Sequence, residues 1–440
     1  MKINLDITKK YIFLDEIKII KYKKFFLIIS PLNAKWLVAK SQVQVDFFNC
    51  LLTNSIQNAL ENFPSETELC KDILIQIEAK DFCIPSVVSA PHKKIQLHLT
   101  NKCNLSCPHC YMNAGKENEN ELSTQEILDL LAGFSNFGFN QLTLTGGEVC
   151  TRSDLLKIAK TAHSLNYRIS ILTNGTLWEE NQITEISKYI SQVQISIDGF
   201  SENTNAKIRG KGSFEKALTA TDFFIKNNVR VCIAITPVEI FSAPSCKIHY
   251  AEFAKNLVQK YKDSKIFSIM FNGDIMDGRN IKYTKKQKAN HLEQVGEIYH
   301  LTFGENSEEI SFIEQNNKNK ISENCAYGSI TISSNGNIYF CSKLINQASP
   351  LNVRSTNIKE IADLSEKISK ASEIKNIITC NKCELRNICG GDCRAIYVDV
   401  LKNTSDFSFI NKKLNRSPCT KEYKEEFYKL MVNTNKYLYK

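Results

Sequence analysis

Six short β-rich runs alternate with amphipathic segments through the middle of the chain, and this alternation constrains the fold more than any other feature. Each run has strand length and ends at Gly, Asn or Pro. The runs are KIQLHLT (94–100), QLTLTGG (141–147), RISILTNG (168–175), QVQISIDG (192–199), RVCIAITP (230–237) and KIFSIMFNG (265–273). Helix start signals lie between them, such as Ser123 followed by Glu126, and Ser213 ahead of an amphipathic run. Repeated βα units predict a parallel α/β sheet, here a partial (β/α)6 TIM-like barrel.

The 440 residues exceed the usual length of one domain, and 42% apolar residues are enough for globular cores, so we expect several domains. Residues 1–90 show β-like runs followed by helix-like runs, which predicts a small α+β domain. The barrel is expected over residues 91–310. Residues 320–440 are rich in cysteine and turn signals, and are expected to form a separate cluster-holding domain.

Sixteen cysteines occur in a long chain whose amino terminus lacks a signal for export or an apolar run that could span a bilayer. Because the cytosol keeps thiols reduced, metal or redox chemistry in the cytoplasm is favoured over a disulfide scaffold. No membrane association is expected. The net charge of +9 comes from scattered lysines rather than from one stripe, which leaves genome-wide composition bias and a functional basic patch as alternatives and makes nucleic acid a poor candidate partner.

The loop after the first β-rich run, TNKCNLSCPHC, contains Cys103, Cys107 and Cys110, and the next cysteine is Cys150. Zinc and cubane iron–sulfur sites usually take four protein ligands. Two interpretations follow: a zinc site completed by His109 or a distant residue, or a [4Fe–4S] cluster with one iron that has no protein ligand. In the second case we expect His109 to pack against the cluster. Barrels place catalytic groups in such loops, after the carboxyl ends of strands.

The CxxxCxxC loop after the first strand of a six-unit barrel resembles the radical S-adenosylmethionine (SAM) superfamily. The resemblance implies that Cys103, Cys107 and Cys110 are catalytic and hold a [4Fe–4S] cluster, whose open iron binds the amino and carboxylate groups of SAM. It also implies reductive cleavage of SAM to a 5′-deoxyadenosyl radical, which abstracts hydrogen from a substrate. The protein supplies placement and exclusion of water.

The ends of the later strands carry residues that this resemblance places at the cofactor. In TGGEVC, the glycines let the backbone approach a ligand closely, and Glu148 can take up the methionine ammonium. For Arg209 a second interpretation remains open, a solvated loop charge. The expected cofactor-binding residues are Gly146, Gly147, Glu148, Thr173, Asn174, Ser196, Asp198 and Arg209.

Seven cysteines follow the barrel in the sequence. Their order and spacing resemble those of the SPASM domain, which one branch of the superfamily carries. Two zinc knuckles would explain the CxxC spacing but not the full set of seven cysteines. The resemblance implies two auxiliary [4Fe–4S] clusters, the second with three evident ligands. Its fourth ligand could be a loop cysteine, water or a substrate thiolate. The first set is Cys380, Cys383, Cys389 and Cys419, and the second is Cys325, Cys341 and Cys393.

Proteins with this barrel and extension modify ribosomal peptides or proteins, and residues 1–90 resemble the winged-helix-like recognition element of peptide maturases. Such an element binds a precursor leader as an added strand. This predicts a maturase that forms a thioether or carbon–carbon crosslink. The alternative is an anaerobic sulfatase maturase that makes formylglycine. In that group an aspartate follows the cysteine of the Gly-x4-Cys motif, whereas Ser342 follows Cys341 here.

A third interpretation is a non-enzymatic iron–sulfur or zinc module for electron transfer or nucleic-acid binding, against which the full SAM pocket argues. The expected cofactors are SAM and three [4Fe–4S] clusters, one for SAM and two auxiliary. The expected partners are a precursor peptide, with its leader on the first domain, and an electron donor such as flavodoxin or ferredoxin. The peptide, the bond formed, its stereochemistry and the oligomeric state do not follow from the sequence.

Overall fold

The structure is a computed structural model that describes residues 6–14, 16–90, 93–316, 319–403 and 406–439. Contacts divide the chain into two compact units. Unit 1 comprises Met1–Pro91, Glu308–Tyr327 and Ser369–Lys440, and unit 2 comprises His92–Ser307 and Gly328–Ile368. The predicted domains include some residues that lie outside the described ranges. These are residues 1–5, residue 15 in the first β-like run, residues 91–92 at a predicted domain boundary, and residues 317–318, 404–405 and 440.

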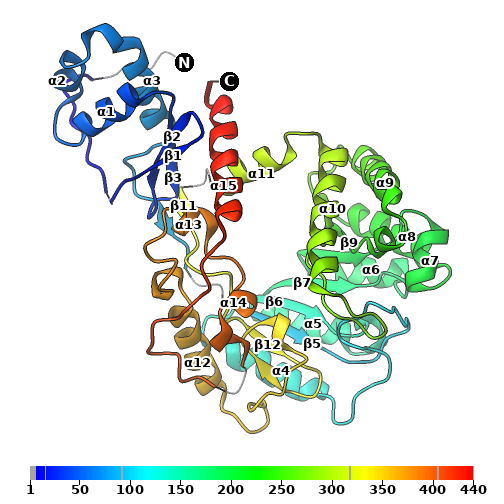
Figure 1. The fold of residues 1–440 in the computed structure, drawn as a ribbon. Coiled ribbons are helices and arrows are strands. Elements are labelled where there is room, and N and C mark those ends of the chain that lie inside the picture. Colours follow the sequence, from blue (N-terminus) through cyan, green and yellow to red (C-terminus); the bar gives the residue numbers. More distant parts are fainter. Residues whose placement is uncertain (1–5, 15, 91–92, 317–318, 404–405, 440) are drawn as a thin grey trace. The chain divides into compact units, whose positions relative to one another are not determined.

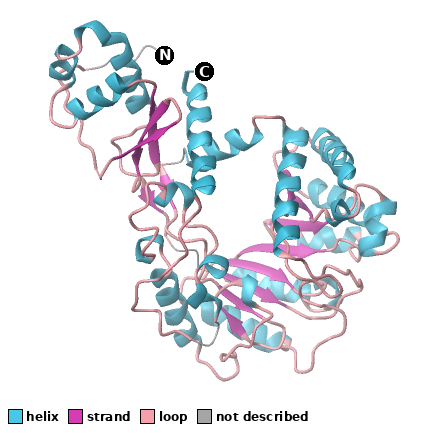
Figure 2. Cartoon of the chain, viewed as in Figure 1, coloured by secondary structure: helices cyan, strands magenta, loops and turns pink. Residues whose placement is uncertain are grey.

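Unit 2 is built on the predicted parallel sheet (Figures 1 and 2). Apolar side chains from its strands, such as Leu144, Ile171 and Ile195, are fully buried. The six strands lie side by side in sequence order and pair in parallel, so the partial (β/α)6 barrel is confirmed. They are β5 (Lys94–His98), β6 (Gln141–Thr145), β7 (Arg168–Thr173), β8 (Gln192–Ser196), β9 (Arg230–Ile235) and β10 (Phe267–Phe271).

Helices join the strands of unit 2. They are α4 (Thr124–Ser135), α5 (Leu155–Ser164), α6 (Glu180–Ile186), α7 (Glu202–Arg209), α8 (Ser213–Lys226), α9 (Lys247–Lys260) and α10 (Lys285–Phe303). Helix α4 begins with the predicted capping box between Ser123 and Glu126. Helix α8 begins at Ser213, as expected, but Ser213 does not cap it. Gly212, at φ 73°, is the N-cap because it takes the left-handed backbone, and the Ser213 hydroxyl instead donates to the Gly210 carbonyl.

Two further strands extend this sheet beyond β5. Strand β12 (Ile330–Ile332) pairs in parallel with β5, and β13 (Ile338–Tyr339) pairs antiparallel with β12. They come from the cysteine-rich part of the chain, and α12 (Ile358–Ala371) follows them. The division into three domains stays a prediction, and the structure adds that residues 328–368 pack with the barrel because β12 continues its sheet.

Unit 1 contains a three-stranded antiparallel sheet followed by helices, the order expected for the first domain. Its first elements are β1 (Lys18–Tyr22), β2 (Phe25–Ser30), β3 (Lys35–Ala39), α1 (Gln42–Leu51), α2 (Ile56–Glu61) and α3 (Thr67–Ala79). Its later elements are β4 (Val87–Val88), α11 (Ser307–Asn316), β11 (Lys320–Ile321), α13 (Arg386–Cys389), α14 (Arg394–Tyr397) and α15 (Lys421–Thr434). Strand β11 pairs with β4.

Both faces of the three-stranded sheet are covered. Ile28 and Leu37 pack with the apolar faces of α1 to α3. Leu27 and Val38, on the opposite face, pack with residues of α13 and α15, including Met431. Burial on both faces explains why FFLIIS in β2 is apolar without alternation.

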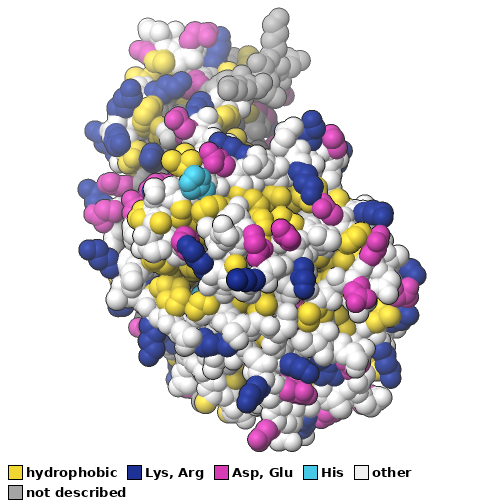
Figure 3. All heavy atoms as spheres, turned by 90° about the vertical axis from the view of Figure 1, so that its right-hand side faces the viewer, with side chains coloured by type: hydrophobic (Ala, Val, Ile, Leu, Met, Phe, Trp, Pro, Cys, Tyr) yellow, Lys and Arg dark blue, Asp and Glu magenta, His cyan; other side chains and the backbone are white. Residues whose placement is uncertain are grey.

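The surface agrees with the scattered charge seen in the sequence. On the face drawn in Figure 3, Lys and Arg side chains are interspersed with Asp and Glu side chains. Among the described residues, no helix has the length and apolar character needed to cross a bilayer.

Candidate active site

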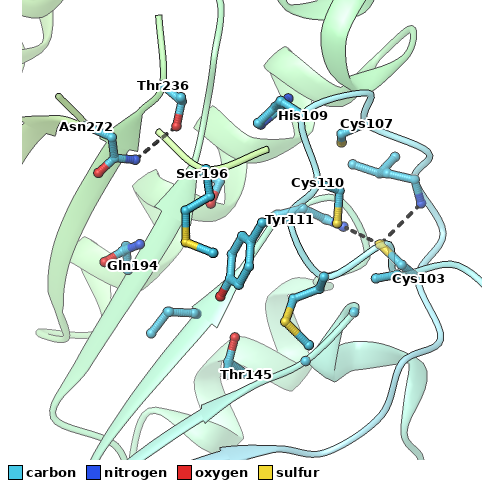
Figure 4. A pocket seen from close by; sticks show the side chains of 18 of the residues that line it. Cys103, Cys107, His109, Cys110, Tyr111, Thr145, Gln194, Ser196, Thr236 and Asn272 are labelled. Atoms are coloured by element: carbon cyan, nitrogen blue, oxygen red, sulfur yellow. Dashed lines mark hydrogen bonds between the residues drawn. The ribbon is translucent and has the colours of Figure 1, made fainter. Parts of the chain in front are cut away.

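A cavity of about 390 Å³ lies in unit 2 at the carboxyl ends of the barrel strands. Figure 4 shows it between the loop that carries the three cysteines and the strand-end residues Thr145 and Ser196. The volume is in the range of small-molecule and cofactor sites. Nine residues predicted from the sequence line it: Cys103, Cys107, Cys110, Gly146, Gly147, Thr173, Asn174, Ser196 and Arg209.

The cysteine loop, defined here as residues 101–115, is fixed by backbone hydrogen bonds. The N–H of Cys103 donates to the carbonyl of Gly115 at 2.9 Å, and the N–H of Leu105 lies 3.4 Å from the Cys103 sulfur. Burial raises the pKa of the Cys103 and Cys107 thiols. Metal binding by these thiols would therefore release protons.

A second loop, between β10 and α10, braces the cysteine loop from outside. The N–H of Arg279 donates to the Cys110 carbonyl at 3.1 Å, and the Arg279 guanidinium donates to the Ala114 carbonyl. Gly278 lies so close that an added Cβ would be 2.5 Å from the Cα of His109. These contacts fix the position of the cysteine loop against the segment that follows β10.

The TGGE turn after β6 lies beside the cysteine loop, and its two glycines line the same cavity. The N–H of Gly147 donates to the Thr100 carbonyl at 2.7 Å. A Cβ on Gly146 would lie 2.4 Å from the Thr100 oxygen, and one on Gly147 would lie 2.2 Å from the Lys102 oxygen. Only glycine fits both positions, because the turn packs directly against the backbone of residues 100–102, and both glycines line the cavity.

Glu148 lies behind the cavity wall and does not line the cavity. Its Oε1 accepts from the Thr173 hydroxyl at 2.6 Å, and its Oε2 accepts from the Asn174 N–H at 2.7 Å. Burial raises the pKa of this carboxyl, although those hydrogen bonds oppose the rise. The predicted contact between Glu148 and the methionine ammonium stays a prediction, and the structure adds that Glu148 joins the TGGE turn to the TNGT turn.

Asp198 is also buried behind the cavity, where it fixes two residues that line it. Its Oδ2 lies 2.5 Å from Nε of Arg209 and 3.0 Å from Nε2 of His109. Burial alone would raise the pKa of Asp198, but Arg209 and His109 outweigh it and hold the pKa well below its usual range. Arg209 is therefore a buried, paired cation rather than a solvated loop charge. Nδ1 of His109 is buried with no partner among the described atoms.

Several cavity residues were not expected from the sequence. Tyr111 projects into the cavity, Gln194 lines it from the middle of β8, and Thr236 and Asn272 line it from strand ends (Figure 4). Thr236 and Asn272 directly follow β9 and β10, so the strand-end rule that selected TNGT would also have found them. Asp274, Tyr283, Ser342 and Lys343 line it as well, and Asp274 forms an ion pair with Lys343. No spacing in the sequence marks this pair.

The four predicted ligands of one auxiliary cluster share a neighbourhood in unit 1. Burial raises the pKa of the Cys419 thiol, Arg416 opposes the rise, and the nearby Cys389 and Cys380 thiols add to it. Lys424 interacts with both Cys383 and Cys419. That these four thiols bind iron stays a prediction.

Two buried arginines lie near cysteines of unit 1: Arg394 near Cys325, Cys380 and Cys389, and Arg416 near Cys419, Cys380 and Cys389. Arg394 is fully buried, and its guanidinium donates to the backbone carbonyls of Ser372, Gly390, Asp392 and Glu323. Arg416 donates to the Gly391 carbonyl at 2.5 Å, and its Nε is buried without a described partner. Neither forms an ion pair with a described carboxylate. Buried cations of this kind call for an anion nearby, and a thiolate-bound iron–sulfur cluster is one.

The second predicted auxiliary set is divided between the units. Cys325 and Cys393 belong to unit 1, and Cys341 belongs to unit 2, where it precedes a short 3-10 helix at Ser342–Leu344. Cys325 is exposed. This ligand set stays a prediction.

The donor groups at the cavity suit a cluster better than a single metal ion. In the described part of the chain, no three His, Cys, Asp or Glu side chains converge as a site for one metal ion. A [4Fe–4S] cluster takes its thiolates on different irons instead. The three cysteines on a cavity wall fit such a cluster with an open iron, and the glycine backbone and the paired Arg209 fit a zwitterionic amino-acid cofactor.

Fold and site together define a class of protein: a partial (β/α)6 barrel whose first strand leads into a cysteine loop at a polar cavity. The model of the Radical SAM superfamily matches residues 97–240, from β5 to the segment after β9. Residues 97–240 are therefore a radical SAM domain, and the resemblance read from the sequence is confirmed.

The sporulation killing factor maturation protein SkfB of Bacillus subtilis (strain 168) is 34% identical over 142 residues, which are 32% of this chain and 34% of SkfB. The chain covers about a third of the length of the first curated relatives that it matches.

Two solved structures share the fold at 18% identity. anSMEcpe with bound AdoMet and Cp18Cys peptide has a TM-score of 0.54, over 78% of this chain and 99% of that one. SuiB of Streptococcus suis bound to S-adenosylmethionine has a TM-score of 0.50, over 89% of this chain and 97% of that one. At this identity the likeness establishes the fold.

Proposed function

We propose that this chain is a radical SAM peptide maturase that crosslinks a ribosomally made precursor peptide through a thioether or carbon–carbon bond. The observation that carries the proposal is the single cavity of about 390 Å³ that unites the three cysteines, the glycine turn and the strand-end polar groups. A site built from loops at the carboxyl ends of barrel strands is the usual place for catalysis on this fold.

Cys103, Cys107 and Cys110 would hold the cluster, and the backbone of Gly146 and Gly147 would meet the methionine end of SAM. When bound, cluster and SAM supply a 5′-deoxyadenosyl radical that takes a hydrogen atom from the substrate. The absence of side chains at Gly146 and Gly147 lets the turn pack directly against the backbone of residues 100–102, which keeps the turn and the cysteine loop together at the cavity.

Other polar residues at the cavity would position the cluster and SAM. Glu148 holds Thr173 and Asn174 at the cavity wall, and Asp198 aims the guanidinium of Arg209, which would face the SAM carboxylate. Ser196 lines the cavity at the end of β8, where a ribose hydroxyl would accept or donate a hydrogen bond.

Two comparisons support a peptide as the substrate. SkfB is named a maturation protein, and anSMEcpe was solved with a peptide. The segment after Cys341 lines the cavity with Ser342 and Lys343, so the residue that is an aspartate in sulfatase maturases lies at the site and is a serine here. Serine is a poor general base at neutral pH, which favours crosslinking over formylglycine formation.

The auxiliary clusters would complete the chemistry. Closing a thioether removes one hydrogen atom from carbon, one proton from the thiol and one electron, and an auxiliary cluster is a suitable acceptor for that electron. A substrate cysteine could be the missing ligand beside Cys325, Cys341 and Cys393. A flavodoxin or ferredoxin would supply the first electron, and the reducing cytoplasm would keep the thiols available.

Mass spectrometry of a co-expressed peptide tests the proposal. The peptide is the product of a short reading frame beside the gene for this chain, expressed with and without the enzyme under anaerobic conditions. A crosslink predicts a product lighter by two hydrogen atoms, with fragment ions missing between the joined residues. An unmodified peptide together with rapid SAM cleavage, or a formylglycine product, would contradict crosslinking.

Iron analysis provides the independent check on the cofactors. Three cubane clusters predict about 12 irons per chain after anaerobic reconstitution. Substantial zinc with little iron would favour the zinc or electron-transfer module instead.

A further inference from the structure

Crosslinking of a peptide releases a proton, and the site must offer a group that accepts it. The substrate loses two hydrogen atoms. One goes to the 5′-deoxyadenosyl radical, and the other leaves as a proton and an electron. A proton acceptor lies within hydrogen-bond reach of the group that loses the proton. The following inference rests on the proposed function, because it assigns this step to a residue of the same cavity.

Most polar side chains at the cavity are unsuited to this task. Tyr111 and Tyr283 line it as phenols, which are protonated at neutral pH. Burial raises the pKa of Tyr283 to about 12, which makes it a still weaker acid. Lys343 is a cation in an ion pair, and the Ser342 hydroxyl is a poor base. None of these four side chains is a base at neutral pH.

The remaining candidates reduce to one carboxylate. Nε2 of His109 lies 3.0 Å from Oδ2 of Asp198, and Nδ1 of His109 is buried. The thiols of the cysteine loop are assigned to the cluster. Among the described residues that line the cavity, Asp274 is then the one carboxylate. A carboxylate on an exposed loop is ionised at neutral pH and can take a proton.

The end of β10 fixes the backbone that carries Asp274. The N–H of Asn272 donates to the Ile235 carbonyl at 2.7 Å, and the Asn272 carbonyl lies 2.9 Å from Nε2 of the buried His291. Asp274 follows two residues later. Its side chain lines the cavity and is 55% exposed, so the carboxylate can reach both a substrate in the cavity and solvent water.

Lys343 holds one oxygen of this carboxylate. It lies in the 3-10 helix Ser342–Leu344 and forms an ion pair with Oδ2 of Asp274. In the part of the chain that the structure describes, no donor bonds the other oxygen, Oδ1. The ion pair therefore orients the carboxylate and leaves Oδ1 available to a substrate group. A proton taken by Oδ1 can pass on to solvent water because the side chain is half exposed.

We propose that Asp274 is the proton acceptor of the crosslinking step, with Oδ1 as the accepting atom and Lys343 as the residue that positions it. For a thioether, the S–H bond of a substrate cysteine breaks, its proton goes to Oδ1, and its electron pair remains on sulfur. That pair forms the bond to the carbon that has lost a hydrogen atom, and the one surplus electron passes to a one-electron acceptor of the iron–sulfur class. For a carbon–carbon bond, the proton comes from the second carbon instead.

Asp274→Asn in the reconstituted holoenzyme tests this proposal. The substrate is the peptide used in the co-expression test, here purified separately from deuterated medium. The amide keeps the size of the side chain but is no proton acceptor. We expect 5′-deoxyadenosine to form and to carry deuterium from the peptide, as with the original chain. The amount of crosslinked product per 5′-deoxyadenosine should fall about 100-fold, the lower end of what general base catalysis contributes.

Asp277→Asn is the matched control in the same loop. Asp277 pairs with Lys288 and does not line the cavity, so its product ratio should equal that of the original chain. Asp274→Glu keeps a carboxylate and should stay within about tenfold of the original chain. Sodium formate supplies a small carboxylate and should raise the product of Asp274→Ala about tenfold, a rescue that a purely structural role would not give.

Three results would overturn the assignment of Asp274. Equal product per 5′-deoxyadenosine from Asp274→Asn and the original chain, or no rescue by formate, would do so while the maturase function stands. Loss of 5′-deoxyadenosine from Asp274→Asn, with normal iron content and a normal circular-dichroism melting curve, would show that Asp274 acts in SAM cleavage instead. If the original chain itself crosslinks no peptide, the proposed function is wrong and the assignment falls with it.

Discussion

The two cysteine sites of this chain differ in how the surrounding charges are arranged. In unit 2, Cys103, Cys107 and Cys110 line a cavity, and the buried cation beside them, Arg209, is already paired with Asp198. In unit 1, Arg394 lies near Cys325, Cys380 and Cys389, and Arg416 lies near Cys419, Cys380 and Cys389. Neither arginine has a carboxylate partner within ion-pair distance among the described residues.

On the proposed function, this difference would separate a site that exchanges a ligand from one that retains an anion. Where the arginine is paired, its charge is balanced by Asp198 and not by a cluster, so the pocket would keep its charge balance while SAM binds and its products leave. Where the arginines are unpaired, a permanently bound anionic cluster would supply their counter-charge and would in turn be easier to reduce. Cluster charge is one of the levers by which a protein sets such potentials.

The largest expected effect is that of Arg394→Met. Four backbone carbonyls would lose their donor in a buried position, which should destabilise unit 1 by about 3 kcal/mol or more. We expect loss of about four irons per chain after reconstitution and a lower melting temperature. Arg354→Met, at an exposed site in unit 2, is the control. Full iron content and an unchanged melting temperature in Arg394→Met would remove the distinction between the two sites.

Asp198→Asn tests the paired site. It would leave Arg209 buried without a carboxylate, a change that costs about 3–5 kcal/mol for buried pairs. SAM cleavage should fall steeply while the irons of unit 1 remain. Glu239→Gln, which removes an ion pair to the exposed Lys207, should change neither. Equal losses of iron from both units after Asp198→Asn would show that the sites are not independent.

Glu148→Gln is expected to have a smaller effect. The amide can still accept from Thr173, but its NH2 group would then face the N–H of Asn174, and two opposed donors cost about 1–3 kcal/mol. We expect the KM for SAM to rise about tenfold with normal iron content, and the exposed Glu117→Gln serves as the control. An unchanged KM would show that the joined turns do not position the cofactor.

The smallest effect is expected for Glu126→Gln, which lies outside both sites. Arg354 and then Ser123 lower the pKa of Glu126 from 4.5 to about 2. Any stabilisation is therefore fully present above about pH 4.5 and is lost as the pH falls towards 2. Because the pair is exposed, we expect about 0.5 kcal/mol or less. Melting curves at pH 7 and pH 3 should show the difference from the original chain shrinking at low pH, with iron and SAM cleavage unchanged at pH 7.

Local patterns in the sequence were enough to predict the barrel and most of its site. Strand periodicity predicted all six parallel strands, and glycines at a strand end predicted the turn at Gly146 and Gly147. These features depend on residues close together in sequence. The cavity residues Thr236 and Asn272 follow the same rule and were overlooked.

Features that depend on contacts between distant residues could not be predicted. Strand β12 pairs with β5 across more than half the chain, and no local signal marks it as part of the barrel sheet. The buried role of Asp198 depends on Arg209 and His109 meeting it from two elements. The bonds that Gln76 on α3 makes to the N–H and C=O of Val38 on β3 are likewise tertiary contacts, which the pattern of three strands and three helices does not reveal.

Formation of 5′-deoxyadenosine by the reconstituted, dithionite-reduced chain with SAM tests the central claim most directly. A variant with Cys103, Cys107 and Cys110 replaced by Ala should form none, whereas a variant with Cys380 and Cys383 replaced by Ala should still form it. Continued formation of 5′-deoxyadenosine without the three loop cysteines would contradict the assignment of that loop as the site of SAM cleavage.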